Sequence, residues 1–219
     1  MADLRILRGI PTDLTHEAAR LLVEAFGLKL ENELRARSAE QVHRLVAGSM
    51  APDLGLVALD SQDDVVGVLG IVVRGRRFFN LSFRRLTLEF GVLGAIPRWA
   101  SSAGEHLVTR PRKAQWRIQM LAVGEEVRGR GIGTALLTTA IEAARDVGMR
   151  TVGLEVVDVN ERALQLYQRL GFRRTCTVPT GRLTALSGFR AVCFMRLDLR
   201  RAPTYGSARP VRLPACRGR

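Results

Sequence analysis

Hydrophobic positions over Ile118–Phe172 follow a strand pattern, then a helical pattern, and then each of the two again. An apolar run ending at Val123 predicts a strand, and apolar residues three and four apart over Thr134–Val147 predict an amphipathic helix. Alternation over Thr151–Val157 predicts a second strand, and the pattern over Asn160–Gly171 predicts a second helix with an asparagine cap. This strand–helix–strand–helix unit organises the rest of the chain.

The flanking segments carry the same two patterns. They predict strands over Leu4–Leu7, Leu54–Leu59, Val65–Val73, Arg173–Val178 and Phe189–Leu199, and helices from Pro11 to Gly27 and over Ala39–Ala47. The polar turn between Leu59 and Val65 predicts a hairpin, and the last two strands are expected to be antiparallel.

Residues 78–115 are rich in large apolar side chains and are broken by Gly91, Gly94 and Pro97. We expect a helical insertion here, whose apolar face lies over a binding cleft or against a second subunit of a homodimer. A helix lying on a membrane surface is the alternative.

The turn between the first strand and helix of the central unit, Arg128–Gly133, holds three glycines and two arginines. Glycines let the backbone turn sharply and present bare N–H groups, and a helix N-terminus attracts anions. A phosphate or pyrophosphate is the expected occupant. A glycine-rich turn that binds nothing is the alternative, and a Walker loop is excluded because no Gly-Lys-Ser/Thr follows.

Glu155 places a carboxylate in the middle of the strand predicted over Thr151–Val157, on the face opposite Val152. A carboxylate at such a position needs a partner or a cleft that water can enter. Two interpretations stay open: an ion pair with an arginine on a neighbouring strand, or a general base in a cleft.

The order Arg128-x-x-Gly131-x-Gly133, then Asn160-x-x-Ala163-x-x-x-Tyr167-x-x-x-Gly171-Phe172, resembles the core signature of the GNAT superfamily of acetyl-CoA-dependent N-acetyltransferases. The resemblance implies an α/β (α+β) fold. Its central sheet would be mixed and mostly antiparallel, with flanking helices and the helical insertion before the central strand. It also implies a single domain over 1–199.

The same resemblance implies roles for individual residues. The turn would hold the coenzyme A pyrophosphate, the strand before it would pair with the pantetheine arm, and Tyr167 would be the general acid near the thioester sulfur. Glu155 stands where RimI-type enzymes have their general base. The residues assigned to acetyl-CoA are Leu121, Ala122, Val123, Arg128, Gly129, Arg130, Gly131, Ile132, Gly133, Thr134, Asn160 and Tyr167.

This chemistry fits direct transfer to a primary amine. The amine must lose a proton before it attacks the thioester, which calls for a base such as Glu155, and the departing thiolate needs a proton, which Tyr167 would supply. The oxyanion would be held by a main-chain N–H near Val123.

Two features depart from the family pattern. Many members have an acid where this chain has Gln119, which leaves Glu89 and His106 as alternative bases. The strands after Phe172 lack the tyrosine-rich segment of RimI-type enzymes. We therefore expect a small-molecule amine as acceptor in preference to a protein N-terminus.

Two other functions remain open. A dinucleotide-binding domain would use Gly129-x-Gly131 before the helix and Asp158 at a strand end, but Thr134 stands where that motif has glycine or alanine. A non-catalytic module that binds acyl-CoA would signal through the insertion or the basic tail.

The chain has 219 residues and a formal net charge of +13, to which the tail over 200–219 contributes six arginines and no acid. We expect that tail to be mobile because it holds little apolar material. Nucleic acid is not expected as the main partner, because no aromatic-basic binding motif is present. No metal-ligand spacing, membrane-spanning apolar run or signal peptide is found, so a cytoplasmic protein without a metal is expected.

Overall fold

The computed structural model describes residues 4–34, 36, 38–108, 114–179 and 188–202. The strands are β1 (Arg5–Arg8), β2 (Gly55–Leu59), β3 (Val65–Val73), β4 (Arg76–Arg77), β5 (Gln115–Val123), β6 (Thr151–Val157), β7 (Arg173–Pro179) and β8 (Ala191–Asp198). The helices are α1 (Thr15–Leu34), α2 (Ala39–Ser49), α3 (Phe83–Val108), α4 (Ile132–Asp146) and α5 (Glu161–Arg169).

The strands form one mixed sheet in the order β1-β2-β3-β5-β6-β8-β7, with β4 pairing beside them on β3. Of the pairs within the described residues, β5–β6 is parallel and the others are antiparallel. The mostly antiparallel sheet and its flanking helices confirm the predicted fold class. They also exclude the dinucleotide-binding alternative, because that fold requires an open, mostly parallel sheet.

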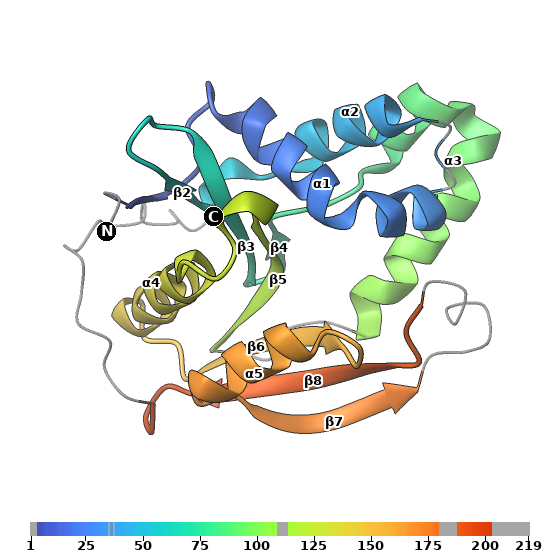
Figure 1. The fold of residues 1–219 in the computed structure, drawn as a ribbon. Coiled ribbons are helices and arrows are strands. Elements are labelled where there is room, and N and C mark those ends of the chain that lie inside the picture. The colour runs from blue at the N-terminus through green and yellow to red at the C-terminus, as the bar shows by residue number, and fades with distance from the viewer. Residues whose placement is uncertain (1–3, 35, 37, 109–113, 180–187, 203–219) are drawn as a thin grey trace.

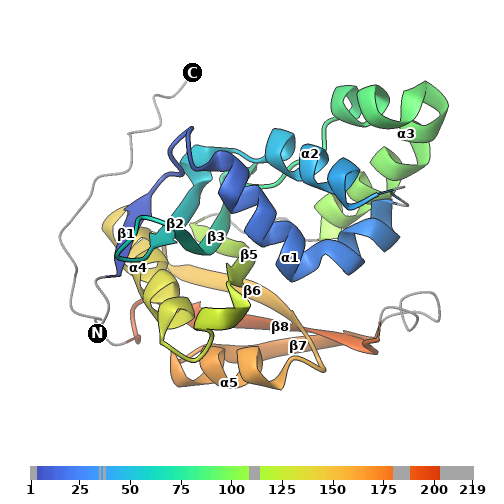
Figure 2. The same cartoon turned by 45° about the horizontal axis from the view of Figure 1, so that its top comes forward.

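Helices cover both faces of the sheet. Figures 1 and 2 show α1 and α2 on one side and α4 and α5 on the other. Alternation along β6 follows this division, since Val152, Leu154 and Val156 are buried in the core. Glu155 projects to the opposite face, where the side chains of a strand alternate.

Close packing of α4 on the sheet depends on glycine at position 67 of β3. A Cβ added there would lie 2.9 Å from side-chain atoms of Ile132 and Leu136. The helix buries one complete apolar face, so its position relative to β3 and β5 is fixed by the core. The residues of α4 that it buries are Ile132, Leu136, Leu137, Ala140, Ile141, Ala143 and Ala144.

One predicted helix end and one predicted buried position were wrong. The first helix was expected to end at Gly27, but α1 continues for about two further turns, to Leu34. Burial of the Leu30 side chain, which is 6% exposed, stabilises this extension. Val147 was assigned to the helix that became α4, yet it follows the last helical residue and is 46% exposed. Gly148, with φ of 73°, ends α4 as predicted.

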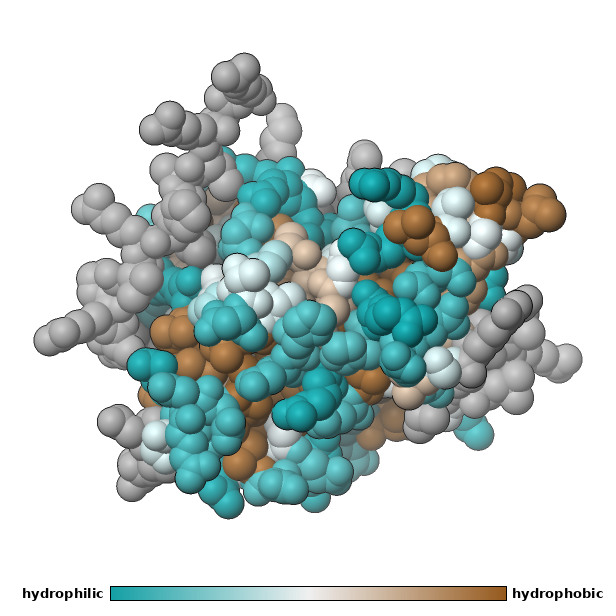
Figure 3. Space-filling view, turned by 90° about the horizontal axis from the view of Figure 1, so that it is seen from above, coloured by the Kyte–Doolittle hydropathy of each residue, from teal (hydrophilic) through white to brown (hydrophobic). Residues whose placement is uncertain are grey.

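The predicted insertion contains the long helix α3, which bends at Gly91, where φ is 70° and ψ is 172°. Leu86 and Ala95 anchor it in the core, while its other apolar side chains form a patch that Figure 3 shows in brown over α3. The large exposed hydrophobic side chains of α3 are Phe83, Leu88, Val92, Leu93, Ile96 and Trp99. Whether a second subunit covers this patch stays a prediction.

The basic tail is described only at its beginning. The backbone N–H groups of Arg201 and Ala202 donate to the carbonyl of Asp198, and Arg145 donates from Nη2 to the carbonyl of Ala202 at 3.2 Å. The prediction that the tail is mobile concerns residues 203–219, which lie outside the described residues.

Candidate active site

The turn before α4 has the conformation that its glycines predict. Gly129 and Gly131 have φ angles of 84° and 86°, and no heavy atom lies within 4 Å of a Cβ added at either one. Gly131 is the cap of α4 and offers no side chain to the first-turn N–H groups. Those N–H groups lack intrahelical partners, so they form a place for an anion at the positive end of the helix dipole.

The two arginines of the turn differ in their contacts. Arg128 is held by its neighbours: Nε donates to the carbonyl of Val123 at 3.3 Å, and Nη1 lies 3.4 Å from Glu125 Oε1. Arg130 is exposed, and no side-chain contact with another described residue is found for it. Arg128 therefore holds the turn against the end of β5, whereas the side chain of Arg130 is available to contact a bound anion.

β5 and β6 run side by side for only three residue pairs, from Gln115↔Thr151 to Arg117↔Gly153. Beyond that point the described pairings of β5 are with β3, and those of β6 are with β8. The two strands thus separate, and one edge of Leu121–Val123 has no partner strand in the described sheet. Main-chain N–H and C=O groups along this edge are available to an extended ligand.

Glu155 and Arg117 form an ion pair on the face that carries α1 and α2. Arg117 Nη1 lies 2.5 Å from Glu155 Oε1, and the side chains are 11% and 26% exposed respectively. The ion pair that the sequence left open is therefore present. Arg117 Nε is buried and makes no hydrogen bond within the part of the chain that the structure describes. Glu155 keeps partial access to solvent, which a proton acceptor needs.

Tyr167 lies on α5, under the opposite face of the sheet. It is 7% exposed, and its ring packs on Phe172 with the centroids 5.9 Å apart. Burial raises the pKa of Tyr167 to about 12. The hydroxyl is therefore protonated at neutral pH and can donate a proton.

Titration provides a test of the Tyr167 environment. Because burial raises its pKa in the folded state above the ordinary value of 10, the native protein holds this proton longer than the unfolded chain does. The stability linked to Tyr167 is fully present below pH 10 and is lost as the pH rises to about 12. The difference in tyrosinate absorbance at 295 nm between wild type and Tyr167→Phe is expected to have its midpoint near pH 12, and a midpoint near 10 would show an exposed ring.

Other candidate residues have structural partners. Asn160 caps α5 as predicted, with Oδ1 accepting the N–H of Ala163 at 3.1 Å. Glu89 accepts two hydrogen bonds from Arg44 on α2. This contact raises the pKa of Arg44. The side chain of His106, the other alternative base, lies outside the described residues. Of the candidate bases, Glu155 is the one that stands on a described strand, two residues past the last pairing of β6 with β5.

The hydrogen bonds of Gln119 explain why this position holds an amide and not an acid. Its side-chain amide forms two hydrogen bonds of 2.9 Å with the backbone N–H and C=O of Phe79. Gln119 stands at a bulge in the β3–β5 register, between Ile118 and Met120. It therefore fastens the beginning of the insertion to the central strand, which a carboxylate cannot do because it has no N–H to donate.

The end of β5, the glycine turn and α5 are neighbours in the structure. Arg128 of the turn donates to the carbonyl of Val123, and a Cβ added at Gly133 would lie 3.7 Å from Val123 and 3.6 Å from Leu166 on α5. Glu155 stands on β6 two residues past its last pairing with β5, at Gly153, and Tyr167 lies on α5 at the opposite face of the sheet. Sequence reasoning did not identify Arg117, although an arginine on a predicted strand beside a strand carrying Glu155 is a signal that was present.

Neither a cluster of metal ligands nor a membrane-spanning helix is found among the described residues. No three side chains of His, Cys, Asp or Glu gather there as a metal site. None of the described helices is long and apolar enough to cross a membrane.

A sequence profile of the acetyltransferase (GNAT) family matches residues 17–172. N-acetyltransferase 8B of Homo sapiens is 37% identical over 87 residues, which cover 39% of this chain and 34% of that protein. N-alpha-acetyltransferase MAK3 of Arabidopsis thaliana is 42% identical over 73 residues, which cover 33% of this chain and 38% of that protein. The matched part thus spans little more than a third of either curated relative.

Similarity to solved structures extends further along the chain. A GCN5-related N-acetyltransferase from Kribbella flavida superimposes with a TM-score of 0.58 at 20% sequence identity. The match covers 89% of this chain and 97% of that one. At this identity the comparison shows a shared fold.

Proposed function

This chain belongs to the GNAT acetyltransferase family, and we propose that it transfers an acetyl group from acetyl-CoA to the primary amine of a small molecule. The observation that carries the proposal is the uncapped glycine turn before α4, which stands directly beside the opening between β5 and β6. In this proposal Glu155, on β6, acts from one face of the sheet and Tyr167, on α5, acts from the other.

The residues of the turn and of β5 fit acetyl-CoA, the acyl donor. The first-turn N–H groups of α4, with Arg130 beside them, would bind the pyrophosphate, and the free edge of Leu121–Val123 would pair with the amides of the pantetheine arm. Asn160 uses its Oδ1 for the cap of α5, so its side-chain NH₂ group is the part available to the donor. Acetyl-CoA supplies the activated thioester.

The placement of Glu155 and Tyr167 on opposite faces suits direct attack. An amine that approaches from the face of Glu155 can give its proton to that carboxylate. The thiolate leaves toward the face of α5, where Tyr167 donates its proton. Arg117 holds Glu155 in place, as a positioning residue that does not itself touch the acceptor. A main-chain N–H near Val123 would stabilise the oxyanion.

A protein N-terminus is the second candidate acceptor. It is favoured by the similarity to N-alpha-acetyltransferase MAK3, which includes 33% of this chain. Free-thiol release from acetyl-CoA, measured with amino acids, polyamines, aminoglycosides and N-terminal peptides, separates the two candidates. Turnover with peptides alone would replace the small-molecule acceptor, and coenzyme binding without thiol release from any amine would favour the non-catalytic module.

Gly131→Ala is expected to weaken acetyl-CoA binding at least about tenfold. Alanine at φ of 86° costs about 1–2 kcal/mol and moves the N–H groups that face the pyrophosphate. Gly148→Ala is the matched control, because Gly148 has φ of 73° and equally open surroundings at the other end of α4. Calorimetric titration should show normal affinity for the control, and equal losses in both variants would mean that the turn has no special part in binding.

A further inference from the structure

A cavity lies beside the first residues of β6, whereas the opening between β5 and β6 lies beside the later residues of that strand. This cavity has a volume of about 560 Å³ and is lined by residues at the start of β6, the end of β8, the start of β7 and the segment after β8. Its volume lies in the range of small-molecule sites. The charged residues of its lining are Arg150, Arg173, Arg196, Arg200, Arg201 and Asp198.

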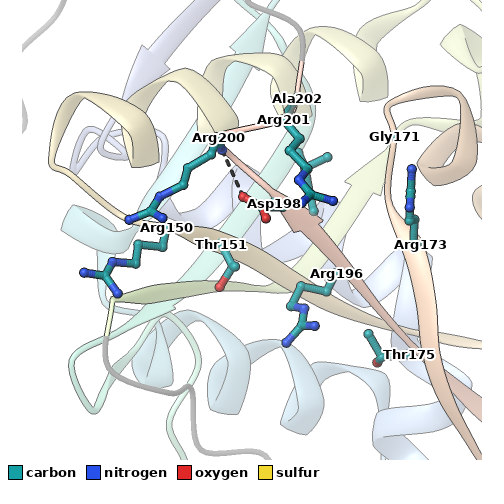
Figure 4. Close-up of a pocket in the computed structure, with 11 residues that line it drawn as sticks. Arg150, Thr151, Gly171, Arg173, Thr175, Arg196, Asp198, Arg200, Arg201 and Ala202 are labelled. Atoms are coloured by element: carbon teal, nitrogen blue, oxygen red, sulfur yellow. Dashed lines mark hydrogen bonds between the residues drawn. The ribbon is translucent and has the colours of Figure 1, made fainter.

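Among the residues that the structure describes, the arginines of this cavity have no counter-ion. No ion pair or side-chain hydrogen bond joins any of the five guanidinium groups to a described residue, and Figure 4 shows them arranged around the cavity. The lone carboxylate, Asp198, accepts the backbone N–H of Arg200 at 3.0 Å, the dashed line in Figure 4. Asp198 is therefore engaged in shaping the turn after β8.

The sheet itself brings two of these like charges together. Arg173 on β7 and Arg196 on β8 stand directly opposite each other in the antiparallel register. Like charges at directly opposite positions destabilise a sheet, and a cluster of unpaired cations repels itself. Bound anions would remove this repulsion, so the arrangement favours a ligand with several negative charges.

We propose that this cavity binds a small phosphorylated molecule. Guanidinium groups match phosphate oxygens through pairs of parallel hydrogen bonds, and five of them around one cavity suit a ligand with more than one phosphate oxygen to offer. The five arginines are exposed and surround one cavity that opens to solvent at the end of the sheet, in place of an extended basic stripe, which favours a small ligand over a nucleic-acid strand.

The cavity is separate from the acetyl-CoA site. The glycine turn begins α4, whereas the cavity lies beyond its C-terminus, where Arg145 contacts Ala202. A helix of 15 residues is roughly 22 Å long, so one compact phosphate group cannot occupy both places. The inference therefore does not depend on the proposed acetyl transfer.

Inorganic pyrophosphate is the probe for this site. Calorimetric and thermal-shift titrations at constant ionic strength would use the full chain as wild type and three double variants. Arg173→Gln/Arg196→Gln removes charge from the cavity, Arg128→Gln/Arg130→Gln removes it from the glycine turn, and Arg162→Gln/Arg169→Gln on α5 is the matched control outside both sites.

In protein that also carries the glycine-turn substitutions, so that the turn does not bind the probe, the cavity substitutions are expected to weaken pyrophosphate binding at least about tenfold, whereas the α5 substitutions leave it unchanged. Without ligand, the cavity variant should melt about 1–3 °C higher, because an opposed pair of like charges is gone. Unchanged affinity on adding the cavity substitutions in that background, a loss confined to the glycine-turn substitutions, or an equal loss with the α5 substitutions would each overturn the proposal. So would binding of an oligonucleotide with none of pyrophosphate.

Discussion

Tyr167→Phe is expected to lower kcat by about 10²-fold and to leave the affinity for acetyl-CoA nearly unchanged. The substitution removes only the hydroxyl and keeps the ring that packs against Phe172. A positioned general acid typically contributes a factor of about 10²–10⁴ to the rate. The wild-type hydroxyl is protonated at neutral pH because burial raises the pKa of Tyr167 to about 12. The expected fall in kcat therefore comes from the loss of this proton donor.

The melting temperature separates this chemical effect from a structural one. Tyr167 makes no side-chain hydrogen bond to another described residue, so phenylalanine should fold with equal or slightly higher stability. Tyr205→Phe changes the other tyrosine of the chain and is the control for assay conditions. Wild-type turnover in Tyr167→Phe would remove this residue from the mechanism.

Glu155→Gln is expected to lower kcat by about 10²–10³-fold, because the amide cannot take a proton from the amine. The same change leaves the Arg117 guanidinium without its anionic partner, at a cost of about 1–2 kcal/mol to the free energy of unfolding, since Glu155 is partly exposed. Turnover and stability therefore both fall in this variant, and a further variant is needed to separate them.

Arg117→Gln supplies that separation. It also breaks the ion pair, but it retains the carboxylate, so it should lose stability and keep most of the activity. The double variant should recover stability without recovering turnover. Activity losses that follow stability across all three variants would show that the pair is only structural.

The elements that carry the motifs were predictable from the sequence. The strand over Thr151–Val157, the cap at Asn160 and the stop at Gly148 each depend on local chemistry, namely alternation, a side-chain acceptor and a positive φ. The helix end assigned to Gly27 failed because a buried contact made later in the chain, at Leu30, outweighed the local preference.

Features that depend on pairing between distant segments were beyond the sequence. The separation of β5 from β6 after three residue pairs follows from the β3–β5 and β6–β8 registers, which no local pattern encodes. The same holds for the use of Gln119 by the insertion and for the arginine cavity, whose members come from three separate segments. Periodicity says which face a residue takes and not which strand lies beside it.

The most direct test of the account is the distance from Tyr167 Oη to the thioester sulfur in a crystal structure of the complex with acetyl-CoA. We expect a separation within hydrogen-bond reach, about 3–3.5 Å, with the pyrophosphate on the N–H groups after Gly131 and the acetyl carbonyl in the opening toward Glu155. A thioester bound on the outer surface of α5, or a pyrophosphate that does not contact the turn, would contradict it.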